Sequence, residues 1–222
     1  KTYMSGIDKD TAHTADGIAS SVTTITGNGA PGNQKAFTLT TGVDKGSSFT
    51  GGSSADVFNA NLSDTTNTLN AFDKLTGGGG TDTLYADIRT AVTPLSLAEI
   101  EVINATFSGA VTFGLSNATS ATTVANVSST ENATFTGIAA GATSLTVQDI
   151  ASDTTTFTYL DATGSSDSAT VAVKNVTGAA AATISVDGVE TLTFNSSIAA
   201  NTYAIAADAA TTLNFGGDQN QK

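Results

Sequence analysis

The chain has 222 residues, a formal net charge of −12 and no cysteine. Its eight basic residues include a single arginine, Arg89, which argues strongly against a nucleic-acid-binding protein because phosphates are neutralised by clustered Lys and Arg. Disulfides are excluded, and no apolar run approaches the roughly 20 residues of a membrane-spanning helix.

The acidic residues are mostly aspartates. Four of the 20 are glutamates and the rest are aspartates, which suit turns and calcium loops better than helices. Only 13% of the residues are charged, against about a quarter in ordinary globular domains. This composition indicates a secreted bacterial β-protein. The chain begins at Lys1 rather than Met, so we interpret it as a piece of a longer protein, and the absence of an export signal here says nothing about that protein.

Residues 1–35 differ from the rest. Ile18, Val22 and Ile25 recur with helical spacing, and a glycine-rich breaker cluster at 27–32 marks a boundary. We expect a short helical or irregular segment, the tail or linker of a preceding domain. His13 has no second His or Cys to join it in a metal site and is expected to lie exposed in this linker.

From Ala36 the pattern changes to strands and glycine turns. The turn at 75–85, LTGGGGTDTLY, fits the calcium-binding nonapeptide G-G-x-G-x-D-x-U-x of repeats-in-toxin (RTX) proteins. The turn at 49–60 carries a looser copy, GGSSADVFN, in which Ser54 replaces the third glycine. Gly51 and Gly77 lie too far apart in the sequence for consecutive nine-residue rungs, so we expect the two turns at corners of neighbouring larger coils.

These turns predict Ca²⁺ sites, because glycines let the backbone aim carbonyl oxygens inward and aspartates add carboxylates. Asp44 and Asp73 precede the two glycine runs and are candidates to share the ions. Glycine turns with an Asp also form corners that bind nothing, and this alternative stays open. The predicted metal ligands are Asp44, Gly51, Ser53, Asp56, Asp73, Gly77, Gly79 and Asp82.

From Ala110 onward the chain is a series of short segments that alternate apolar and polar residues and start at short, fairly regular intervals. Two such strands per coil give a rung of about 22 residues. We predict an all-β fold in which residues 36–222 form an elongated right-handed parallel β-helix, or β-solenoid.

Glutamates recur in similar contexts. Glu101 and Glu190 each precede a strand, with Glu131 as a third candidate, which suggests a repeated coil corner. A glycosidase would also need two carboxylates. No other catalytic motif accompanies these residues: H-E-x-x-H, G-x-S-x-G and a cysteine nucleophile are all lacking, so we expect no enzyme.

Residues 37–106, with FTLTTGVD, both glycine turns and EIEVINAT, resemble the S-layer proteins of Caulobacter-type bacteria, which type I systems secrete. The resemblance implies a calcium-bound β-solenoid at the cell surface that assembles with copies of itself into a two-dimensional lattice. It also implies that a preceding part of the protein binds cell-surface polysaccharide. An RTX-type adhesin, or another non-catalytic binding segment, is the alternative function. No membrane insertion is expected.

Overall fold

The computed structural model describes residues 34–161, 163–178 and 181–221. The chain divides into residues 1–33 and a compact unit, Gln34–Lys222, whose start lies close to the predicted boundary. The expected helical or irregular N-terminal segment, with His13, lies outside the described residues. Within them the only helix is a short 3-10 turn, η1 (Gly46–Phe49).

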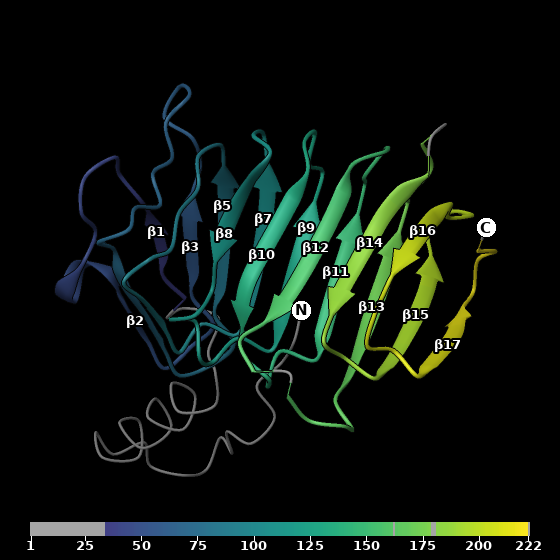
Figure 1. The fold of residues 1–222 in the computed structure, drawn as a ribbon. Coiled ribbons are helices and arrows are strands. Elements are labelled where there is room, and N and C mark those ends of the chain that lie inside the picture. Colours follow the sequence, from purple (N-terminus) through teal and green to yellow (C-terminus); the bar gives the residue numbers. More distant parts are fainter. Residues whose placement is uncertain (1–33, 162, 179–180, 222) are drawn as a thin grey trace, which may run out of the picture. The chain divides into compact units, whose positions relative to one another are not determined.

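The compact unit is an all-β solenoid of about eight turns, as the strand spacing predicts (Figure 1). Odd-numbered strands form one nine-stranded parallel sheet along the whole stack. Its strands are β1 (Ala36–Thr38), β3 (Val57–Ala60), β5 (Thr83–Ile88), β7 (Val102–Phe107), β9 (Thr123–Val127), β11 (Ser144–Gln148), β13 (Ser168–Lys174), β15 (Thr191–Ser197) and β17 (Thr212–Gly217).

Even-numbered strands form two further parallel sheets. The three-stranded sheet contains β2 (Thr50–Gly52), β4 (Lys74–Gly78) and β6 (Ser96–Ala98). The five-stranded sheet contains β8 (Val111–Gly114), β10 (Ala133–Ile138), β12 (Thr154–Tyr159), β14 (Ala182–Asp187) and β16 (Tyr203–Ala206).

Coil length varies around the predicted value. The coil that runs from Val57 to its register partner Thr83 is longer than the coil from Val102 to its partner Thr123. The coil from Thr83 to its partner Val102 is shorter than both. The corners absorb these differences, because the strands must stay in register to keep the same side chains facing inward.

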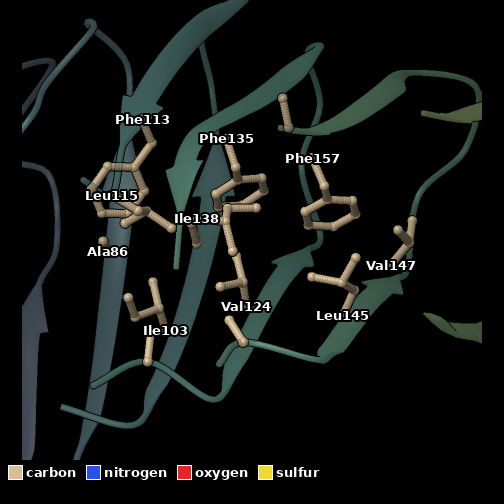
Figure 2. Packing of buried hydrophobic residues seen from close by; sticks show 14 of the residues in the cluster. Ala86, Ile103, Phe113, Leu115, Val124, Phe135, Ile138, Leu145, Val147 and Phe157 are labelled. Atoms are coloured by element: carbon tan, nitrogen blue, oxygen red, sulfur yellow. The ribbon is translucent and has the colours of Figure 1, made fainter. Parts of the chain in front are cut away.

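The core is built from rows of identical or similar residues that stack from coil to coil. Phe113, Phe135 and Phe157 occupy one register position on β8, β10 and β12, and all three are fully buried. The rings of Phe135 and Phe157 stack with centroids 5.2 Å apart. They face a row of aliphatic side chains on the opposite sheet that includes Val124 and Leu145 (Figure 2). This arrangement holds the coils, and therefore the corners, in fixed register.

Candidate functional site

The two glycine turns lie on adjacent coils, as the sequence predicts. Strand β2 pairs with β4 so that Gly52 lies opposite Gly78, and the N–H of Gly79 donates to the carbonyl oxygen of Gly52 over 2.7 Å. Gly79 also lies directly over Ser53, whose Cα is 3.5 Å from the position that a Cβ on Gly79 would take. Four of the predicted ligand residues, Gly51, Ser53, Gly77 and Gly79, are thus brought together at one corner.

Carboxylates at this corner form a ladder that runs from coil to coil. The backbone N–H of Lys35 donates to Oδ1 of Asp56 over 2.5 Å, and the N–H of Asp56 donates to Oδ1 of Asp82 over 2.6 Å. The N–H of Asp82 donates to Oε2 of Glu101 over 2.8 Å. We call Lys35, Asp56, Asp82 and Glu101 the Asp82 ladder. Each carboxylate in it binds the backbone of the preceding coil, so the ladder itself joins successive coils.

Asp44 and Asp73 form a separate pair. The N–H of Asp44 donates to Oδ1 of Asp73 over 2.8 Å, and the N–H of Asn70 donates to Oδ2 over 2.7 Å. Both oxygens of Asp44 accept hydrogen bonds from Thr40. Burial, ahead of the nearby charge of Asp44, raises the pKa of Asp73. Asp73 precedes Gly77 by four residues of the extended strand β4, about 13 Å, so the structure does not bring this pair to the Asp82 ladder.

Each glycine turn places a carboxylate oxygen beside a carbonyl oxygen. A Cβ built on Gly51 would lie 2.4 Å from Oδ2 of Asp56 and 1.8 Å from the carbonyl oxygen of Gly77. A Cβ on Gly77 would lie 2.4 Å from Oδ2 of Asp82 and 1.7 Å from the carbonyl oxygen of Glu99. Only glycine leaves room for these oxygens, which explains the residue type at both positions.

The two turns differ in whether the Oδ2 atom of their aspartate accepts a hydrogen bond. Oδ2 of Asp56 accepts the N–H of Gly52 over 2.5 Å. Oδ2 of Asp82 is buried and has no hydrogen-bond partner among the described residues. Gly78, the register partner of Gly52, has a φ of 97°, a left-handed conformation that favours glycine. Burial raises the pKa of Asp82, and the carboxylates of Glu101, Asp56 and Glu99 raise it further.

Lys35 closes the first turn with a cation from the chain itself. Its Nζ donates to the carbonyl oxygens of Thr50 and Gly51 over 3.2 and 3.0 Å. Sequence reasoning missed this residue. Lys35 precedes Asp56 by one coil length, so a known period would have placed it on the ladder.

The oxygens at the second turn therefore fit a calcium ion better than those at the first. Calcium prefers carboxylate and carbonyl oxygens together with water, about six to eight in all. Asp82 offers a buried oxygen beside the carbonyl of Glu99, and within residues 34–161, 163–178 and 181–221 no N–H group donates to it. No three His, Asp or Glu side chains converge as a metal-binding group in the part of the chain that the structure describes. The remaining ligands of an ion at Asp82 would come from backbone oxygens and water.

A second aspartate repeats the arrangement of Asp82 near the other end of the solenoid. The N–H of Asp167 donates to Oε2 of Glu190 over 2.9 Å, and Oδ2 of Asp167 is buried without a partner among the described residues. A Cβ on Gly164 would lie 2.6 Å from this oxygen. The repeated corner predicted for Glu101 and Glu190 is thus confirmed. Glu131 precedes β10 of the other sheet, so its inclusion in that repeat was wrong.

Comparison with protein-family models, with curated proteins and with solved structures gives no match. Among the described residues, no helix is long and apolar enough to cross a membrane. Functional inference therefore depends on the geometry of the chain itself.

Proposed function

We propose that this chain is a structural segment of a secreted bacterial surface-layer protein, stabilised by Ca²⁺ at the second glycine turn and assembling with copies of itself on the cell surface. The observation that carries the proposal is the buried Oδ2 of Asp82, which lies beside the carbonyl of Glu99 and accepts no hydrogen bond from any residue that the structure describes. An acceptor of this kind costs free energy unless a proton or a cation satisfies it.

Calcium would stabilise the fold by offsetting the repulsion between the carboxylates of the Asp82 ladder. Asp56, Asp82 and Glu101 lie on successive coils, about 4.8 Å apart. At an effective dielectric constant of about 20, two like charges at this spacing repel by roughly 3 kcal/mol. A bound calcium ion supplies positive charge that offsets this repulsion. Asp82 would hold the ion through Oδ2, while its Oδ1 keeps the adjacent coil in register.

Assembly is supported by the last described coil. Leu213 and Phe215 on β17 pair in register with Leu192 and Phe194 of β15, which are fully buried. Phe215 is nevertheless 58% exposed, because no further coil covers it in the described structure. An exposed apolar row beside an unpaired strand edge can pair with one more strand, whether from a following part of the same protein or from another chain.

Thermal unfolding with and without calcium tests the metal site. Calcium at about 100 times its Kd stabilises the folded state by about 2.7 kcal/mol, which raises the Tm of a chain of this size by about 5–10 °C. In Asp82→Asn, the amide can keep the hydrogen bond from Asp56 and donate a second one to Glu99. We expect this variant to melt higher than wild type in EGTA and to lose the calcium response.

Asp64→Asn is the matched control, because Asp64 is exposed and lies outside the ladder. It should respond to calcium as wild type does. Equal melting of the wild type in calcium and in EGTA would contradict the calcium site. Electron microscopy of the chain should show ordered sheets that EGTA disperses. Calcium-dependent melting without any sheet would overturn the surface-layer function and favour the adhesin.

A further inference from the structure

A groove lined largely by polar residues lies on the outer face of the nine-stranded sheet, away from the glycine turns. Its volume is about 540 Å³, within the roughly 300–1,000 Å³ of small-molecule sites. Side chains from five neighbouring strands, β3 to β11, line it. They include Asn59, Tyr85, Asp87, Asn104, Thr106 and Gln148.

Tyr85 is the single aromatic residue among the described lining residues, and amides flank it on both sides. It lies in register between Asn59 on β3 and Asn104 on β7, about 4.8 Å from each strand. Its side chain is 47% exposed, whereas Leu84 and Ala86 on either side of it point into the core. Among the described hydrogen bonds, none involves the side-chain amide of Asn104. The side-chain amide of Asn59 donates to the carbonyl oxygen of Phe37 over 3.4 Å, so in the described part of the chain the polar group left free beside the exposed ring is the side-chain amide of Asn104.

We propose that this groove binds a neutral oligosaccharide. A half-exposed tyrosine ring offers a flat apolar face for the C–H groups of a sugar ring, and Asn, Gln and Asp side chains supply the donors and acceptors that hydroxyl groups need. Five strands at about 4.8 Å spacing span about 19 Å, the length of an oligosaccharide rather than of a single sugar.

Other ligand classes fit the groove less well. No Lys or Arg is among the described residues that line it, so a phosphorylated or otherwise anionic ligand would find no counter-charge. An extended peptide would need a free sheet edge for backbone pairing, and β5, β7 and β9 are paired on both sides. The proposal is independent of calcium and of lattice assembly, because none of the groove residues named above belongs to the Asp82 ladder.

Binding of neutral glycans by the whole chain tests the proposal. An array of neutral and anionic oligosaccharides is screened first, and calorimetry follows with cellotetraose, maltotetraose and mannotetraose. We expect wild type to bind at least one neutral oligosaccharide. Tyr85→Ala should weaken binding about tenfold or more, since it removes the stacking surface, whereas Tyr85→Phe should retain it. Asn104→Ala should weaken binding through lost hydrogen bonds.

Phe72→Ala is the control, because Phe72 is 69% exposed but lies outside the groove. It should bind as wild type does, and Asp82→Asn should also bind equally whether or not calcium affects stability. Circular dichroism checks that each variant is folded. The proposal is overturned if no neutral oligosaccharide binds, if only anionic glycans are retained, or if folded Tyr85→Ala binds as tightly as wild type.

Discussion

At the scale of single residues, one corner of the solenoid requires a left-handed backbone on successive coils. Ser128, Asp149, Asn175 and Ile198 each follow a strand of the nine-stranded sheet and have φ values of 53°, 56°, 54° and 71°. Asn and Asp tolerate this conformation best among residues with side chains. The amide of Asn175 donates to Asp149 over 2.7 Å, and this bond, followed by one from Gln148, lowers the pKa of Asp149. Ile198 differs from these residues, because a β-branched side chain disfavours the left-handed conformation.

Replacing Ile198 should therefore stabilise the chain. Its β-branched side chain is 66% exposed and strained at a φ of 71°, so Ile198→Asn loses little packing and relieves a cost of about 1–2 kcal/mol. We expect a Tm increase of a few degrees in thermal unfolding. Leu160→Asn is the control, since Leu160 is 62% exposed without a positive φ, and it should change Tm little. Equal shifts in both variants would show that removing an exposed apolar group, not strain, is responsible.

At the scale of elements, glycine at the second turn is dictated by the contact between coils. In Gly77→Ala the new methyl group would lie 1.7 Å from a backbone oxygen of the next coil, which cannot move without breaking register. We expect a loss of about 3 kcal/mol in the free energy of unfolding, together with loss of any calcium response. Urea denaturation measures the first quantity, and melting in calcium and in EGTA measures the second.

Gly141→Ala provides the comparison, because nothing lies within 4 Å of the position of its Cβ and its φ is not positive. This variant should be neutral or slightly stabilising. If Gly77→Ala were as stable as Gly141→Ala, the carbonyl oxygen of Glu99 could not lie as close to Gly77 as the structure places it.

The elements were largely predictable from the sequence, and the contacts between them were not. Alternation of apolar and polar residues predicted the series of short strands from Ala110 onward, where β8 to β17 lie, because side chains on a strand alternate between core and solvent. The contacts of Lys35 and Asp167, and the row of Asn59, Tyr85 and Asn104, join residues one coil apart. Successive coils differ in length, as the pairings of Thr83 with the strands before and after it show, so alternation alone could not fix which residues meet.

At the scale of the whole solenoid, β17 differs from the strands that precede it. Every inner strand of the nine-stranded sheet is paired on both sides, whereas β17 is paired only with β15. On β17 the core row continues as Leu213 and Phe215, and the ring of Phe215 stacks on Phe194 with centroids 6.0 Å apart. The apolar row and the free backbone edge coincide, and this combination favours the stacking of another strand in register.

In this chain on its own, β17 should therefore drive self-association. Phe215→Asp places a charge on the open core face, which disfavours stacking because a buried, unpaired carboxylate is costly. We expect analytical ultracentrifugation to show concentration-dependent association of wild type and a more monomeric variant. Phe72→Asp should associate as wild type does, since Phe72 is also exposed but lies away from β17. If both variants associate to the same extent, the contact lies elsewhere on the solenoid.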